Sequence, residues 1–464
     1  MTVRLTHDLG RFISNLRYTD IPREVISRVC VAFTDCIAVT IVGAREPAPQ
    51  LLRSVLAPGG DESTFIGGAG RASAMDAAWV NGTAAHALDF DDDAQRGGHV
   101  SAVLVPAVMA EAEAVGASGE QMVVAYAAGY ETLAELIWRD PGQHHEKGWH
   151  PTGVFGAVAA AAACASLRRL DPEKSAMAVA LSASQSAGLI ANVGTMTKPF
   201  HAGNAARSGL VSARLANAGF SAADDAFEHS PGFLKAFSPG GPIDLDTPVR
   251  AGQEWRLCGS NRLSTKQYPL CYYTHRVIDG TLDLLQENPV RASDIERITV
   301  SISPRNATIL RYHLPQTGLE AKFSIQFAVV APIIAGQPGL SELTDEFVRK
   351  PEVQALMKRV MVMREERDDP DLPGYAIYDQ VVIEMRDGRR IESARVNKIR
   401  GGPDLPLSRD ALWAKFESCV EQGDARMPSR KMFDALMALD ELPRIGDFVS
   451  LMSVNESELA RQVA

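Results

Sequence analysis

Histidines beside carboxylates mark the first segment of this sequence that could do chemistry. It begins at His86, continues through Asp89 and the aspartates at 91–93, and ends with Arg96 and His99. A neighbouring carboxylate sets the tautomer of an imidazole and raises its basicity, which suits general acid–base catalysis. Four carboxylates in five residues also have the composition of a divalent-cation site, a helix cap or a solvated loop. The segment alone leaves these alternatives open.

Two further segments place basic side chains next to predicted helices. His150 immediately precedes a helix of small residues, whose N-terminus would attract a carboxylate, although His150 could also merely cap that helix. In residues 194–204, Lys198 and His201 lie in a loop bounded by Gly and Pro, and Arg207 follows shortly after. This pattern is typical of an anion site and also of a solvated loop.

A fourth segment, residues 266–276, contains Lys266, Tyr268, Cys271 and His275. Cys271 is either a small residue that fills space beside Pro269 or a substrate contact. A nucleophilic role would require a depressed thiol pKa. Together, the four segments supply basic and proton-transferring groups suited to a small polyanionic acid.

The elements that must position these residues are mainly helices. Apolar and small-residue patterns predict helices over residues 101–115, 153–167, 175–188, 341–361, 408–422 and 429–440. The β-branched alternation from Ile298 predicts a strand, and residues 378–391 predict a hairpin that turns at Asp387 and Gly388. We therefore expect a mainly α fold: a large all-helical domain from residues 1–262 and 404–464, with a smaller α+β lid domain inserted at 263–403.

Composition narrows the class of protein. The 464 residues carry 47 Lys and Arg against 57 Asp and Glu, a net charge of −10, which argues against nucleic acid or an anionic membrane as partner. The N-terminus has no apolar signal region, and the longest apolar stretch, residues 153–166, is short for a membrane span. The six cysteines show no CxxC spacing. We expect a reduced, cytoplasmic protein without structural zinc.

The ordered motifs carry a resemblance that covers essentially the whole chain. HALDFDD at 86–92, His99, HPTG at 150–153, TKPFHAGNAA at 197–206 and K-x-YP…THR at 266–276 resemble the MmgE/PrpD family. That resemblance implies a homodimer with a helical domain and an α+β lid, and a site between the domains that needs no cofactor or metal. It places five residues at active-site positions: Asp89, His99, His150, Lys198 and Lys266.

The resemblance also implies roles. His99 or His150 would be the base or acid, oriented by Asp89, while Lys198 and Lys266 would bind substrate carboxylates. Further substrate contacts are expected from Asp93, His201, Arg207, Tyr268, Cys271 and His275.

The family includes 2-methylcitrate dehydratases, iminodisuccinate epimerases and cis-aconitate decarboxylases. All three handle a proton on a carbon next to a carboxylate. We expect a 2-methylcitrate-type dehydratase, a lyase, with an epimerase as the alternative. The decarboxylases resemble the chain less at Asp93, Cys271 and Phe327, where they carry threonine, histidine and tyrosine. A non-catalytic organic-acid binding protein and a metal-dependent hydrolase are the alternatives from other classes.

Overall fold

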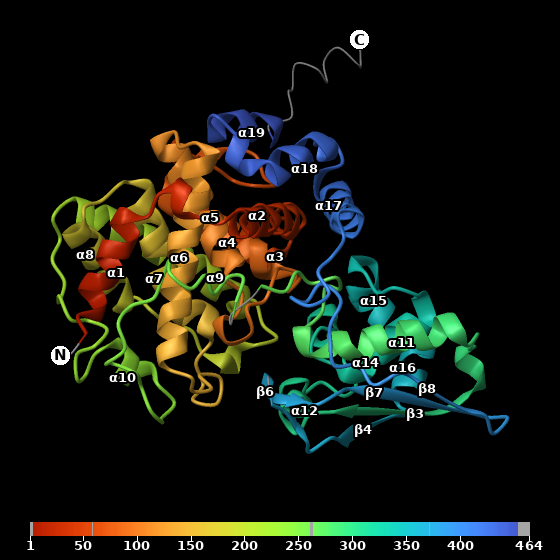
Figure 1. Ribbon diagram of the computed structural model, residues 1–464. Coiled ribbons are helices and arrows are strands. Elements are labelled where there is room, and N and C mark those ends of the chain that lie inside the picture. Colours follow the sequence, from red (N-terminus) through yellow and green to blue (C-terminus); the bar gives the residue numbers. More distant parts are fainter. Residues whose placement is uncertain (1–2, 58, 260–262, 371, 453–464) are drawn as a thin grey trace, which may run out of the picture. The chain divides into compact units, whose positions relative to one another are not determined.

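The computed structural model describes residues 3–57, 59–259, 263–370 and 372–452 (Figure 1). Its helices greatly exceed its strands, so the predicted mainly α fold is confirmed. The chain forms two compact units. The first comprises Met1–Thr265 together with Ser408–Ala464, and the second comprises Lys266–Leu407.

The first unit is helical apart from a two-stranded ribbon of β1 (Ser63–Thr64) and β2 (Arg71–Ala72). Its helices are α1 (Leu5–Asn15), α2 (Arg23–Gly43), α3 (Pro47–Ser54), α4 (Ala74–Ala87), α5 (Ser101–Val115), α6 (Gly119–Arg139), α7 (Pro151–Leu167), α8 (Pro172–Ala183), α9 (Thr197–Asn217), α10 (Phe233–Phe237), α17 (Arg409–Asp424), α18 (Ser429–Met437) and α19 (Ile445–Met452).

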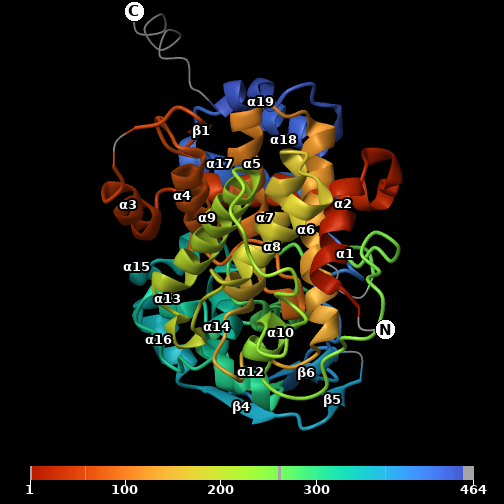
Figure 2. The same ribbon diagram turned by 90° about the vertical axis from the view of Figure 1, so that its left-hand side faces the viewer.

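Small side chains let the central helices approach closely. Helix α7 packs against both α9 and α6, and Figure 2 shows it between them. Nearly all of its residues are buried, including the alanine run at 159–163. The helices predicted over 101–115 and 153–167 are confirmed as α5 and α7, whereas α8 ends at Ala183, earlier than predicted.

The crossing of α4 and α9 depends on two glycines. The Cα of Gly203 faces Gly82, and a Cβ at Gly203 would collide with the Trp79 carbonyl oxygen and with Thr83. This close crossing sets the spacing between His86 near the end of α4 and Lys198 near the start of α9.

Gly203→Ala is therefore expected to lower the free energy of unfolding by about 1–3 kcal/mol, because the backbone of α4 must move away. Gly446→Ala is the matched control: Gly446 also lies in a helix, α19, and a Cβ there meets nothing within 4 Å. Urea unfolding of both variants checks the prediction. Equal stabilities for the two would contradict the close crossing.

Residues 153–166 are expected to be the longest apolar stretch, but α2 is a longer apolar segment. Among the described residues it is long and apolar enough to cross a membrane, but 83% of its apolar window is buried inside the protein. It packs against α4 and α17 as a core helix of the first unit.

The second unit combines a sheet with short helices. Its four-stranded sheet has the order β4-β3-β7-β8, with β3 parallel to β4 and antiparallel to β7. The strands are β3 (Ile295–Ile302), β4 (Val360–Arg364), β5 (Asp368–Asp369), β6 (Leu372–Ala376), β7 (Gln380–Met385) and β8 (Arg390–Glu392). The helices are α11 (His275–Glu287), α12 (Pro304–Ile309), α13 (Gly318–Ala321), α14 (Ile325–Ala335), α15 (Asp345–Val348) and α16 (Pro351–Met357).

The predicted strand from Ile298 is confirmed as β3, and the predicted hairpin as β7 and β8. Its turn uses Gly388 at φ +89°, a conformation that glycine adopts without strain. The single helix expected over residues 341–361 is wrong. Pro351 begins a separate short helix, and the chain then enters β4 at Val360, where it pairs with Ile298.

Candidate active site

The loop after α4 turns sharply at Asp89. Its φ of +54° is left-handed, a region that aspartate tolerates better than most residues. The side chains of Asp89, Asp91 and Asp92 are all buried. The turn lets three neighbouring carboxyl groups serve different partners within the first unit.

Asp91 holds two histidines. One of its oxygens lies 3.0 Å from His99 Nδ1, and the other lies 2.9 Å from His86 Nδ1. Burial would raise the pKa of the Asp91 carboxyl, but the two imidazoles outweigh burial and hold that pKa well below its usual range. Burial lowers the pKa of His86 to about 3, so His86 is neutral at pH 7. His99 Nδ1 also lies 3.0 Å from the Asp92 carbonyl oxygen, which can only accept a hydrogen bond. This geometry places the proton of His99 on Nδ1 and leaves Nε2 as the available base.

Asp89 and Lys198 form a buried ion pair beside that base. The Lys198 ammonium donates to Asp89 Oδ1 at 2.9 Å, and the same oxygen lies 3.5 Å from His99 Nε2. Asp93 Oδ2 is 3.8 Å from His99 Nε2. From the sequence, Asp89 is expected to orient His99; in the structure Asp89 lies beside Nε2 of His99, and the carboxylate at Nδ1 belongs to Asp91.

His150 and His201 form a second imidazole pair. Their Nδ1 atoms lie 3.1 Å apart, so one nitrogen donates and the other accepts. Burial, followed by the positive charge of Lys198, lowers the pKa of His201 to about 4 and also that of His150. His150 occupies the N-cap position of α7 but makes no side-chain capping bond. The capping alternative is thus wrong for its side chain.

The neutral pair should make folding sensitive to acid. The pKa of His201 is 6.5 in its ordinary state and about 4 in the folded protein, so the folded state binds fewer protons between these values. Its contribution to stability is present above pH 6.5 and is lost as pH falls toward 4. Buried Glu131 and Asp379, whose pKa values burial raises to about 7, act in the opposite direction.

A comparison of variants separates these effects. Between pH 7 and pH 4.5, the Tm of His201→Asn is expected to fall less than that of the wild type. The Tm of His229→Asn, which removes an exposed histidine, should fall as much as that of the wild type. Thermal unfolding across that range checks this. A His201→Asn slope as steep as that of the wild type would count against a buried neutral pair.

Backbone contacts fix the remaining geometry. The His99 amide donates to Thr152 Oγ1 at 3.0 Å, which ties the first motif to the start of α7. Ser101 donates through its amide and hydroxyl to Asp92. Burial, with Asp35 and Asp91 adding repulsion, raises the pKa of Asp92 well above its usual range. Asp93 pairs through its backbone with Ser264.

Four other predicted residues lie in the second unit, three of them in the segment that leads into α11 and the fourth, His275, as the first residue of that helix. Lys266, Tyr268, Cys271 and His275 are all buried. Tyr268 donates to Asp279 Oδ1 at 2.8 Å, which fastens the segment to α11. The Cys271 carbonyl accepts from the Thr274 amide and hydroxyl, and His275 Nε2 lies 3.3 Å from the Leu270 carbonyl oxygen. These contacts hold Tyr268 and His275 in place within that unit, and their expected contact with substrate stays a prediction.

Arg207 does not join the histidines. It comes nine residues after Lys198 on α9, about two and a half turns, and therefore projects from the opposite face of the helix. Its guanidinium lies 4.3 Å from the ring centre of Trp79. The substrate-binding role expected for Arg207 is not supported by this placement.

His86, Asp89, Asp91 and His99 bring possible metal ligands within 4.8 Å of one another. Asp89 Oδ1 already serves the ion pair with Lys198, and the Nδ1 atoms of both histidines face Asp91. An ammonium group thus lies on Asp89 where a cation would have to compete. The arrangement fits acid–base chemistry without requiring an ion.

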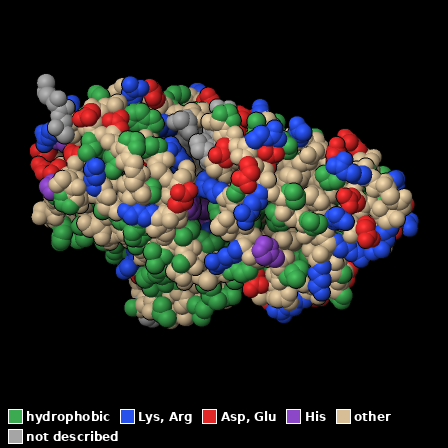
Figure 3. Space-filling model, turned by 90° about the horizontal axis from the view of Figure 1, so that it is seen from below, with side chains coloured by type: hydrophobic (Ala, Val, Ile, Leu, Met, Phe, Trp, Pro, Cys, Tyr) green, Lys and Arg blue, Asp and Glu red, His purple; other side chains and the backbone are tan. Residues whose placement is uncertain are grey.

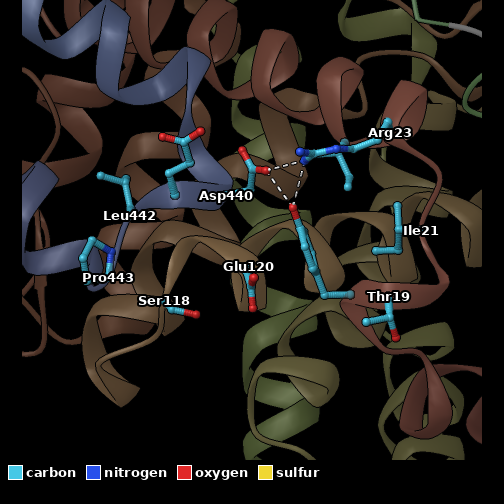
Figure 4. A pocket seen from close by; sticks show the side chains of 11 residues that line it. Thr19, Ile21, Arg23, Ser118, Glu120, Asp440, Leu442 and Pro443 are labelled. Atoms are coloured by element: carbon cyan, nitrogen blue, oxygen red, sulfur yellow. Dashed lines mark hydrogen bonds and ion pairs between the residues drawn. The ribbon is translucent and has the colours of Figure 1, made fainter.

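A separate cavity of about 640 Å³ lies elsewhere in the first unit (Figure 4). Its polar groups are largely paired: Tyr18 donates to Asp440 at 2.6 Å, and Arg23 lies 3.2 Å from the same carboxylate. None of its lining residues belongs to the histidine cluster. On the face drawn in Figure 3, acidic and basic side chains are interspersed.

Sequence reasoning omitted Asp91 and His86 from the site, although both lie in its first motif. The five-residue spacing of His86 and Asp91, across the end of a helix, was the available signal. Thr152 was inside the HPTG motif but was given no role.

Two family models together match most of the chain. Residues 7–246 match the MmgE/PrpD N-terminal domain, and residues 268–436 match the MmgE/PrpD C-terminal domain. The chain is 29% identical to a human cis-aconitate decarboxylase over 74% of this chain and 72% of that protein. It is 27% identical to the mouse protein of that name over 79% and 76%, and 26% identical to one from Aspergillus terreus over 97% and 96%.

Proposed function

Because the chain belongs to the MmgE/PrpD family, we propose that it is a lyase that moves a proton at a carbon next to a carboxylate of a small di- or tricarboxylic acid. The observation that carries the proposal is the buried Asp91–His99 pair, with the Lys198 ammonium beside it. The Asp91 carboxylate and the Asp92 carbonyl oxygen both face Nδ1 of His99 and keep its proton there, so Nε2 can accept a proton from carbon. Lys198 supplies positive charge against the enolate-like charge that develops.

His99 fits the role of base better than His150. Both imidazoles are buried, but only His99 has a carboxylate at Nδ1 to stabilise its protonated form. His150 faces another neutral imidazole, and its lowered pKa weakens it as a base. In this assignment, His150 and His201 contact the substrate as neutral hydrogen-bonding groups.

We propose dehydration of a 2-methylcitrate-type acid as the reaction. His99 takes the carbon-bound proton, and the adjacent hydroxyl leaves as water after it receives a proton. Asp93, 3.8 Å from His99 Nε2, is a second ionisable group at the same place, as a reaction that needs both acid and base requires. Decarboxylation of cis-aconitate is the second candidate, because the relatives reported above carry that name.

Proton NMR in D₂O distinguishes these reactions. The protein is incubated with 2-methylcitrate, citrate, cis-aconitate and iminodisuccinate in buffer with and without EDTA. A vinyl product from 2-methylcitrate or citrate supports dehydration, and loss of CO₂ from cis-aconitate identifies a decarboxylase. Deuterium entry into iminodisuccinate without loss of a group identifies an epimerase. Absence of exchange and product with all four acids overturns the proposal, and inhibition by EDTA would make the reaction metal-dependent.

A further inference from the structure

A buried lysine contacts the loop that contains the aspartates, residues 89–93. Lys415 on α17 donates to the Phe90 carbonyl oxygen at 2.7 Å, although the two residues are 325 positions apart. Its ammonium also lies 2.5 Å from Asp35 on α2 and 4.0 Å from the centre of the Phe90 ring. Lys415 is only 8% exposed and Asp35 only 1%. Such a buried lysine needs partners of this kind to keep its charge.

The contact between Lys415 and the Phe90 carbonyl oxygen constrains the backbone next to Asp91. Phe90 stands between Asp89 and Asp91, and its carbonyl belongs to the peptide plane that leads directly into Asp91. Because a peptide group is planar, fixing that oxygen fixes the direction in which the chain enters Asp91. Asp91 in turn holds His99 Nδ1 at 3.0 Å. Helix α17 packs beside α2, so the two charged partners come from a rigid pair of helices (Figure 1).

We propose that Lys415, paired with Asp35, is a positioning residue that holds the Phe90–Asp91 peptide and thereby orients the Asp91–His99 pair for proton transfer. This rests on the proposed function for its kinetic effect, but its geometric effect on His99 does not. Lys415 acts through the carbonyl oxygen of Phe90, whereas Lys198 pairs with the side chain of Asp89. Lys415 is therefore a support for the site and is distinct from Lys198, which belongs to it.

The test must separate positioning from stability. Lys415→Met leaves the Asp35 charge buried and unpaired, which destabilises the fold independently of any effect on the site. The double variant Lys415→Met/Asp35→Asn removes both charges and is the variant to measure. Lys431→Met is the control, since Lys431 is exposed on α18.

The readouts are kinetic and spectroscopic. In the folded double variant, kcat is expected to fall about tenfold to a hundredfold with KM within about threefold, because a small misplacement of the base slows proton transfer more than binding. ¹⁵N-histidine NMR, with His99 assigned from a His99→Asn variant, is expected to show loss of the His99 Nδ1–H signal held by Asp91. Lys431→Met should change neither.

An unchanged His99 signal in a folded double variant overturns the proposal, whatever the kinetics. If the unsubstituted protein turns over none of the four acids, the proposed function fails, and a changed His99 signal in the double variant still supports positioning by Lys415.

Discussion

Replacing His99 with asparagine is expected to lower kcat by about 10²–10⁴-fold, the usual contribution of a positioned general base. The amide of asparagine can still donate to Asp91 at the position of Nδ1, but it has no basic atom at the position of Nε2. Lys198, which is assigned to the substrate carboxylate, is unchanged. Binding of the acid should therefore survive, and the measurement is kcat beside the Kd of the most active of the four acids.

His229→Asn is the matched control, because it removes an exposed histidine on the same unit. His150→Asn is the informative comparison. If His150→Asn abolishes deuterium exchange while His99→Asn retains it within tenfold, the base is His150. Asp91 then does not orient the catalytic base. Near-wild-type Tm values for all three variants would exclude unfolding as the cause of any loss of activity.

The helices and the chemical segments were predictable because their signals are local. The small-residue stretches that became α5 and α7 are continuous in sequence, and the Asp-Gly turn determines the β7–β8 hairpin from two residues. The helix wrongly predicted over residues 341–361 shows where local signals fail. Residues 341–361 have apolar side chains at helical spacing, yet Val360 pairs with Ile298 of β3, a contact that no local pattern contains.

The arrangement inside the site was less predictable, for two physical reasons. Asp89 adopts a left-handed conformation, so the neighbouring carboxylates do not follow the spacing of a helix or a strand. Asp91 therefore reaches His99 Nδ1, and Asp89 turns to Lys198. Lys415 reaches the loop from the far end of the sequence, and only the packing of α17 on α2 brings it there. Arg207 differs, since its helical phase relative to Lys198 was readable from their spacing.

Asp91→Asn is expected to have an effect on kcat as large as that of removing the base. In the folded protein the Asp91 carboxylate lies 2.9 Å from His86 Nδ1 and 3.0 Å from His99 Nδ1, and the Asp92 carbonyl oxygen also lies 3.0 Å from His99 Nδ1. An asparagine has one oxygen and one NH₂ group, so it can accept from only one of the two imidazoles and must present a donor to the other. A histidine that faces this donor has to place its lone pair on Nδ1 and its proton on Nε2.

If His99 switches in this way, its Nε2 no longer accepts a proton from carbon. A wrong tautomer of this kind lowers kcat by about 10⁴-fold where an equivalent aspartate has been replaced in a catalytic triad. We expect a fall of that order in kcat, KM changed by only a few fold, and a ¹⁵N spectrum in which the proton of the His99 imidazole moves from Nδ1 to Nε2.

Asp89→Asn makes the comparison decisive, because both substitutions remove one buried carboxylate charge from the same loop. Asp89 contacts the ammonium of Lys198 and lies near His99 Nε2, so its loss should change the Kd of the acid and leave the tautomer of His99 unchanged. The opposite pattern, in which Asp89→Asn moves the His99 proton and Asp91→Asn leaves it in place, would return the orienting role to Asp89. The histidine spectrum thus decides which carboxylate sets the base, independently of which acid the protein consumes.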